Sequence, residues 1–189
     1  MVGNAAQARR FAIESLSQGK SKYAVTLAAV AYAQAGDVSR AKKLAEDLDK
    51  RYPADTLLQA YWLPSIRAFI EISRNNPTRA VEVLGVTAPY ELASPGILFG
   101  PVYARGEAYL LWHRGTEAVA EFQKIVDHPG IDIDPIGALA FLGMARGYAL
   151  EGDTPKARAA YEYFLTLWKD ADPDIPIYRQ AKAEYAKLQ

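Results

Sequence analysis

The clearest structural pattern of this chain lies in LGMARGYALEGDTPKARAAYEYFLTL, residues 142–167. Apolar residues recur at three- and four-residue steps on both sides of a short break, which is the spacing of two amphipathic helices. Gly152 ends the first helix, and Asp153 or Thr154 caps the second, whose first turn accommodates Pro155. The stretch therefore predicts a helical hairpin.

The same pattern returns along the chain. KYAVTLAAVAYAQAGDVSRAKKLAEDL (22–48) and RGEAYLLWHRGTEAVAEFQKI (105–125) also carry a tyrosine, a break with glycine, and an alanine nine residues after the tyrosine. The three pairs are Tyr32 with Ala41, Tyr109 with Ala118 and Tyr148 with Ala157. A weaker copy at 65–84 has Ala80 at the alanine position and Glu71 at the tyrosine position. The alanines stand 38 or 39 residues apart, so one register runs through the chain.

This register predicts an all-α chain in which the tyrosine of each first helix packs over the small alanine of the second. We expect a single domain over residues 1–189 that forms a right-handed α-α superhelix of about four helical hairpins. The expected hairpins cover about 21–56, 60–92, 99–131 and 138–172, and a capping helix covers about 175–188. That helix should bury Ile177 and Ala181 and turn Glu184 mostly toward solvent.

These residues resemble the tetratricopeptide repeat, whose pattern is Trp-x2-Leu-Gly-x2-Tyr, eight residues, Ala-x3-Phe-x2-Ala and a late proline. Gly106, Tyr109, Ala118 and Phe122 match it in the third copy. PYELASPG (89–96) and FLTLWKDADPDIP (164–176) are similar to the C-terminal repeat region of bacterial serine/threonine kinases of the eukaryotic-like type and of related winged-helix regulators. The resemblance implies a partner-binding or sensory region of a signalling protein.

The composition excludes several classes of function. Twenty-two basic residues balance 22 acidic ones, which argues against nucleic acid as a partner. The longest apolar stretch is far below the ~20 residues of a membrane-spanning helix, so we expect no membrane insertion. There is no cysteine, which removes thiolate chemistry and leaves the compartment open.

We expect no catalytic, cofactor-binding or metal-binding residue. A kinase's glycine-rich loop, His-Arg-Asp loop and Asp-Phe-Gly triplet are all absent from the sequence, so the chain is not expected to be an enzyme. His113 and His128 stand in or near breaks and are interpreted as exposed loop residues. The alternating aspartates of DADPDIP (170–176) lack the glycine and the late glutamate of a calcium loop.

First helices line the concave face in the family that the chain resembles, and this implies a groove for a protein or peptide partner. Its aromatic and mildly polar character suits such a partner. The alternative is that several of these aromatic side chains, Trp62 and Phe69 above all, belong to the core. The candidate residues are Tyr23, Thr26, Trp62, Ser65, Phe69, Tyr103, Glu107 and Arg146.

Two arginines, Arg67 and Arg105, occupy positions that normally carry a large aliphatic residue facing the partner helix. A buried arginine needs a carboxylate or carbonyl groups around it. Glu71 lies one turn after Arg67, so we expect a structural ion pair between them, with a ligand anchor as the alternative.

The sequence therefore predicts a non-catalytic interaction scaffold. Two rival hypotheses stay open. The chain could mediate homodimerisation through Trp168 and the second helices, or hold a small ligand between the second and third repeats, near the Pro/Gly-rich segment 87–102.

Overall fold

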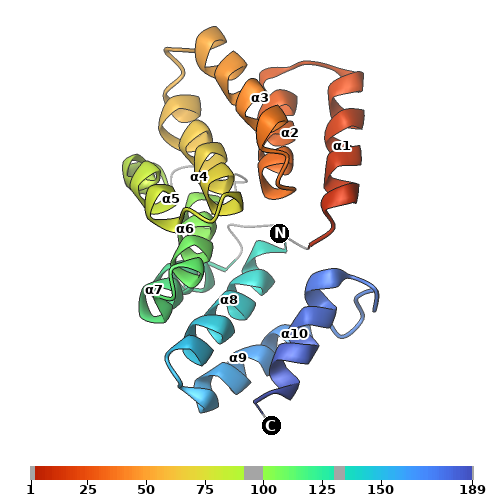
Figure 1. Cartoon of the computed structure of the whole chain (residues 1–189), viewed down its shortest axis with the longest axis vertical. Coiled ribbons are helices and arrows are strands. Elements are labelled where there is room, and N and C mark those ends of the chain that lie inside the picture. The colour runs from red at the N-terminus through yellow and green to blue at the C-terminus, as the bar shows by residue number, and fades with distance from the viewer. Residues whose placement is uncertain (1–2, 92–99, 130–134, 189) are drawn as a thin grey trace. The chain divides into compact units, whose positions relative to one another are not determined.

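A computed structural model of the chain describes residues 3–91, 100–129 and 135–188, and every regular element in these ranges is a helix (Figure 1). The described residues form two compact units. The N-terminal unit is Asn4–Ala93, and the C-terminal unit is Ser94–Gln189 together with Met1–Gly3. The all-α prediction is confirmed, while the superhelix and its hand stay predictions.

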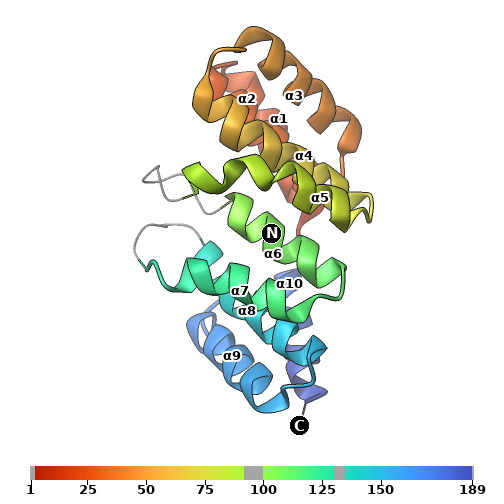
Figure 2. The ribbon, with the colours of Figure 1, turned by 90° about the vertical axis from the view of Figure 1, so that its left-hand side faces the viewer.

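The N-terminal unit is a series of helices packed on their neighbours in the chain. α1 contacts α2, α2 pairs with α3, and α4 lies against both α2 and α3 before pairing with α5 (Figures 1 and 2). The elements are α1 (Ala5–Gln18), α2 (Lys22–Gln34), α3 (Val38–Arg51), the π-helix η1 (Leu58–Trp62), α4 (Leu63–Ser73), α5 (Pro77–Val83) and the 3-10 helix η2 (Gly85–Tyr90).

The π turn of η1 has a local cause. Pro64 follows it in the first turn of α4 and has no N–H to donate to the carbonyl group four residues earlier. The Leu63 N–H donates instead to the Leu58 carbonyl, five residues back. A continuous helical segment thus runs from Leu58 to Ser73 despite the proline.

The C-terminal unit repeats the hairpin arrangement. α6 pairs with α7, α7 and α8 lie side by side, α8 pairs with α9, and α10 packs on α9 (Figure 2). The elements are α6 (Gly100–Leu111), α7 (Gly115–Val126), α8 (Ile136–Leu150), α9 (Thr154–Leu167) and α10 (Pro176–Ala186).

Four hairpin turns share one geometry. Each turn begins at the residue of the tyrosine position, which is Tyr32, Glu71, Tyr109 or Tyr148. The fourth residue after it has a positive φ, and the N–H of the fifth donates a hydrogen bond of 2.9 Å to its carbonyl group. This is the Schellman ending of a helix. The residues with positive φ are Gly36 (72°), Asn75 (60°), His113 (56°) and Gly152 (77°).

The second helices of the first and last hairpins begin with aspartate caps, of which the one at Asp153 was among those predicted from the sequence. The Asp37 side chain accepts a hydrogen bond from the Arg40 N–H at 3.3 Å, and Asp153 accepts one from the Lys156 N–H at 3.2 Å. Pro155 lies in the first turn of α9. The alanines at the repeat position, including the Ala80 of the degenerate copy, have no exposed surface.

Candidate functional site

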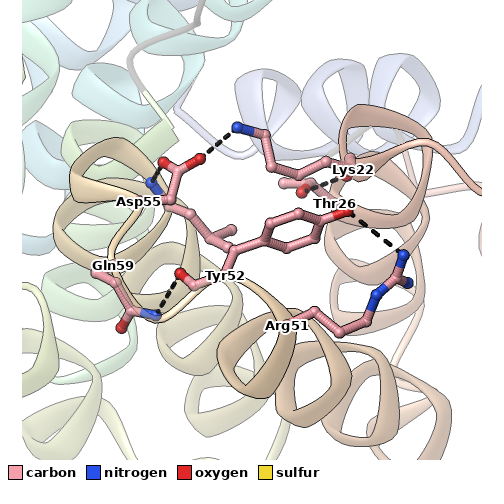
Figure 3. Close-up of polar contacts among 7 residues, drawn as sticks. Lys22, Thr26, Arg51, Tyr52, Asp55 and Gln59 are labelled. Carbon is pink, nitrogen blue, oxygen red and sulfur yellow. Dashed lines mark hydrogen bonds and ion pairs between the residues drawn. The ribbon is translucent and has the colours of Figure 1, made fainter.

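The threonine and the serine among the predicted groove residues of the N-terminal unit are both buried. The Thr26 hydroxyl donates to the Lys22 carbonyl at 2.8 Å, one turn earlier in α2 (Figure 3). The Ser65 hydroxyl donates in the same way to the Tyr61 carbonyl at 2.6 Å. Both hydroxyl groups therefore use their hydrogen bonds inside their own helices.

Two aromatic groove candidates of this unit are core residues. Trp62 is 9% exposed and meets the Tyr61 ring edge to face, and Phe69 is 7% exposed. The structure thus favours the core alternative for both. Tyr23 is 56% exposed and is the candidate of this unit whose side chain faces solvent.

A polar network ties the start of α2 to the segment between α3 and η1 (Figure 3). Lys22 pairs with Asp55, which also accepts a hydrogen bond from the Leu58 N–H at 2.9 Å, and the Lys22 bond holds the pKa of Asp55 below its usual value. The Gln59 side chain donates to the Tyr52 carbonyl at 3.2 Å. Because these groups satisfy one another, the network serves to join helices.

The predicted ion pair between Arg67 and Glu71 is replaced by two other pairs. Arg67 donates a hydrogen bond of 2.8 Å to Asp49 on the neighbouring helix α3, and the Arg67 side chain is 48% exposed. Glu71 accepts from Arg74 at 3.1 Å and from the Asn76 side chain at 3.0 Å. An exposed arginine can reach a carboxylate on another helix, so the spacing of one turn does not decide its partner.

Arg105 does have the carboxylate that a buried arginine requires. Its guanidinium donates to Glu121 of α7 at 3.0 Å, and both side chains are nearly buried. Lys124 also donates to Glu121, at 2.8 Å. This pair joins α6 to α7 and is structural.

The packing of Phe122 brings α6 and α8 together. A Cβ atom at Gly106 of α6 would lie 2.6 Å from the Phe122 ring, and one at Gly143 of α8 would lie 2.4 Å from it. Only residues without a side chain fit this close approach. The candidate residues Glu107, beside Gly106, and Arg146, one turn after Gly143, are thereby set on adjacent helices.

Arg146 is the centre of a polar cluster in the C-terminal unit. Its Nε and Nη2 donate to the two carboxylate oxygens of Glu184 in α10 at 2.9 and 3.2 Å. The same carboxylate accepts hydrogen bonds from the Tyr161 hydroxyl at 3.0 Å and from the Gln180 amide at 2.8 Å. We name Glu107, Arg146, Tyr161, Gln180 and Glu184 the Arg146 cluster.

Glu107 is the unsatisfied member of this cluster. Its Oε1 atom is buried, and it has no hydrogen-bond partner within the described ranges, although part of the residue remains exposed. Tyr103, one helical turn earlier, lies beside it and packs edge to face on Phe122 at 5.6 Å. A buried acceptor without a donor is costly, so Oε1 of Glu107 is an atom that a water molecule or a partner group is expected to contact.

The pKa shifts of the cluster follow from burial and from these charges. Burial raises the pKa of Glu107, and the charge of Arg146 opposes this effect. The pKa of Tyr103 is raised mainly by burial and to a smaller extent by the charge of Glu107. The pKa of Tyr161 is likewise raised mainly by burial and to a smaller extent by the charge of Glu184. Burial works against the charged form of Arg146, but the Glu184 carboxylate raises its pKa overall.

The sequence interpretation found three of the residues gathered here, Tyr103, Glu107 and Arg146, and missed Glu184. It expected Glu184 mostly on the exposed side of the capping helix. A signal was present, because Glu184 lies seven residues after Ile177 and three after Ala181, on the face that these two buried residues define.

The described side chains contain no group of three or more metal-ligating residues, and no helix in those ranges is long and apolar enough to cross a membrane. His128 Nδ1 forms a hydrogen bond with the Lys124 carbonyl, and His113 lies in a hairpin turn. Neither histidine belongs to the Arg146 cluster. The Arg146 cluster can therefore act through hydrogen bonds and charge.

Residues 92–99 of the Pro/Gly-rich segment lie outside the described residues.

No family model, no curated protein and no solved structure matches this chain.

Proposed function

We propose that this chain is a non-catalytic scaffold that binds a protein or peptide partner, and that the Arg146 cluster with Tyr103 is its recognition site. The observation that carries the proposal is the buried Oε1 of Glu107, which has no hydrogen-bond donor among the residues that the structure describes. It lies near the Glu184 carboxylate, whose donors all come from the same unit. The stability of the fold alone does not account for a glutamate at position 107, because a buried acceptor without a donor destabilises the folded state.

The surroundings of the site support binding in preference to catalysis. The cluster lacks a nucleophile paired with a base, since its members are carboxylates, a guanidinium, a phenol and an amide. Arginine and tyrosine are the residue types that dominate protein interfaces. The likeness to the repeat region of bacterial serine/threonine kinases supports a place for this scaffold in a signalling protein.

A direct test is to probe an immobilised array of short peptides of randomised sequence with the purified chain. The bound peptides are then titrated into the isotope-labelled chain while backbone amide shifts are followed by NMR. We expect saturable shifts at residues 103–107, 143–146 and 180–184. Absence of saturable binding across the array, or shifts confined to α3 and α5, would contradict the proposal.

A second candidate function, homodimerisation, is favoured by two exposed side chains on α9. Tyr163 and Leu167 are one turn apart and 50% and 51% exposed, and the Tyr163 ring contacts Phe141. Trp168, the contact expected from sequence, packs on Phe164. Light scattering over a range of concentrations tests this candidate, because a constant monomer mass excludes it and a mass that rises toward twice the monomer supports it.

A further inference from the structure

We propose that α1 is a self-association surface, on which α1 of a second copy of this chain packs antiparallel with Phe11 at the centre of the contact. The surface belongs to the N-terminal unit and lies on a different helix from the exposed pair of α9, so it goes beyond the proposed function. Three features of α1 support it, which are an exposed ring, a hollow on the same helix and two opposite charges.

Phe11 is the exposed ring. Its side chain is 52% exposed, and the Arg10 guanidinium lies 5.6 Å from the ring centroid. α1 packs on α2, and its buried residue is Ala12. Phe11 precedes Ala12 and therefore points about 100° away from it around the helix axis. Single exposed apolar residues are ordinary, so the neighbours of Phe11 decide whether the ring has a use.

The face of α1 that carries Phe11 corresponds to a covered face of α7. In α7, Glu121 directly precedes the buried Phe122 and pairs with Arg105 of α6 at 3.0 Å. Phe11 directly precedes the buried Ala12 in the same way, but no helix in the described ranges covers it. The uncovered face is thus one against which a helix packs in another hairpin.

A hollow on the same helix has room for the ring. Asn4, Ala6, Gln7 and Arg10 line an open hollow of about 360 Å³. A cavity of ~150 Å³ already holds benzene, so a phenyl ring fits. The Arg10 guanidinium, which lies over the Phe11 ring of its own chain, offers a cation–π contact to a ring that enters. A projecting ring and a hollow on one helix make the surface complementary to itself.

The charges beside Phe11 favour an antiparallel pair. Arg10 and Glu14 are exposed, and neither has an ion pair among the residues that the structure describes. An antiparallel pair reverses the order of the two charges, so Arg10 of each copy lies on the side of Glu14 of the other, whereas a parallel pair opposes like charges. Two-fold symmetry supplies both pairs at once. Exposed pairs of this kind fix orientation more than affinity.

The test measures the mass of the full chain by sedimentation equilibrium, from low micromolar to submillimolar concentration. The proteins are the natural chain, Phe11→Ser and Ile13→Ser. Ile13 is a matched control, because it is 53% exposed on the same helix but lies about 200° further around the axis. Thermal melts followed by circular dichroism confirm that each variant is folded.

We expect the mass of the natural chain to rise toward twice that of the monomer. Phe11→Ser should raise the dissociation constant of the dimer about tenfold or more, since both copies lose the ring, and Ile13→Ser should leave it nearly unchanged. A natural chain that stays a monomer throughout overturns the inference. A dimer that Phe11→Ser leaves intact, or that Ile13→Ser weakens equally, also overturns it.

Charge exchange tests the antiparallel arrangement. Arg10→Glu leaves two acidic groups beside Phe11, and Glu14→Arg leaves two basic groups, so each variant alone should dimerise more weakly than the natural chain. An equimolar mixture of the two should form a mixed dimer that is tighter than either variant dimer. Absence of this recovery overturns the antiparallel pair.

The same measurement separates this surface from the α9 candidate. A dimer that Tyr163→Ser abolishes and Phe11→Ser retains would assign self-association to α9 and overturn the inference. The peptide test of the proposed function is independent of both results, because it reads out the Arg146 cluster.

Discussion

Arg146 of α8 and Glu184 of α10 are joined by two hydrogen bonds, of 2.9 and 3.2 Å, across 38 residues of sequence. The pair fastens the last helix to the hairpin before it. Each side chain is about one-quarter exposed or less, so solvent screens the interaction only in part.

Removal of one partner should therefore be costly. Glu184→Ala takes away the acceptor of Arg146, Tyr161 and Gln180, and we expect the free energy of unfolding to fall by about 2 to 3 kcal/mol in chemical denaturation. The control is Asp47→Ala, which breaks the exposed pair with Arg51 and should change stability much less. Equal effects of the two substitutions would show that the cluster adds no stability.

Removal of the Glu107 carboxylate should have the opposite effect and stabilise the folded chain at neutral pH. Since burial raises its pKa in the folded state, its ionisation destabilises the fold as pH rises from the usual glutamate value toward neutrality. We expect Glu107→Gln to raise the free energy of unfolding at pH 7, and the gain to shrink as the pH falls through the usual glutamate range, where the carboxyl becomes protonated in both states.

Denaturation curves at both pH values measure this difference. Arg146, the N-terminal amino group, Tyr103 and Glu184 also act on Glu107, so the comparison keeps all four unchanged. Glu117→Gln serves as the control, because it makes the same substitution at a partly exposed carboxylate that pairs with Arg114, and it should not stabilise the chain. A gain of the same size at low and neutral pH would contradict the assigned cause.

The repeat register was readable from the sequence because it depends on local rules. The tyrosine-to-alanine spacing and the aspartate caps at Asp37 and Asp153 are each decided within about ten residues. Even the degenerate copy keeps the register, since Glu71 replaces the tyrosine while Asn75 supplies the positive φ that the turn requires.

The site was only partly readable because its contacts join distant segments. Arg146 meets Glu184 across two helices, and a pattern on one helix cannot show which carboxylate on another will face it. Likewise, Trp62 and Phe69 carry the residue types of a binding groove, yet they fill the core. Composition does not separate these roles, because both depend on apolar area.

The glycines around Phe122 give a sharp packing test. We expect Gly143→Ala to lower the free energy of unfolding by about 2 kcal/mol or more, because its Cβ would fall 2.4 Å from the Phe122 ring. Gly137→Ala in the same helix meets nothing within 4 Å and should be neutral or stabilising by up to about 1 kcal/mol. Thermal denaturation of both variants measures the contrast, and replacing the ring with the smaller aliphatic side chain in Gly143→Ala/Phe122→Leu should recover part of the loss.

The turn at His113 offers a stabilising change. His113 has a φ of 56° at the position where Gly36 and Gly152 stand in other hairpins, and a residue with a side chain is strained there. We expect His113→Gly to raise the free energy of unfolding by about 1 kcal/mol, and Gly152→Ala, its converse, to lower it by a similar amount. His128→Gly serves as the control for loss of an imidazole, because it removes one, with its hydrogen bond to the Lys124 carbonyl, at a position without positive φ and should not stabilise the chain. A loss of stability in His113→Gly would show that the imidazole contributes more than its backbone strain costs.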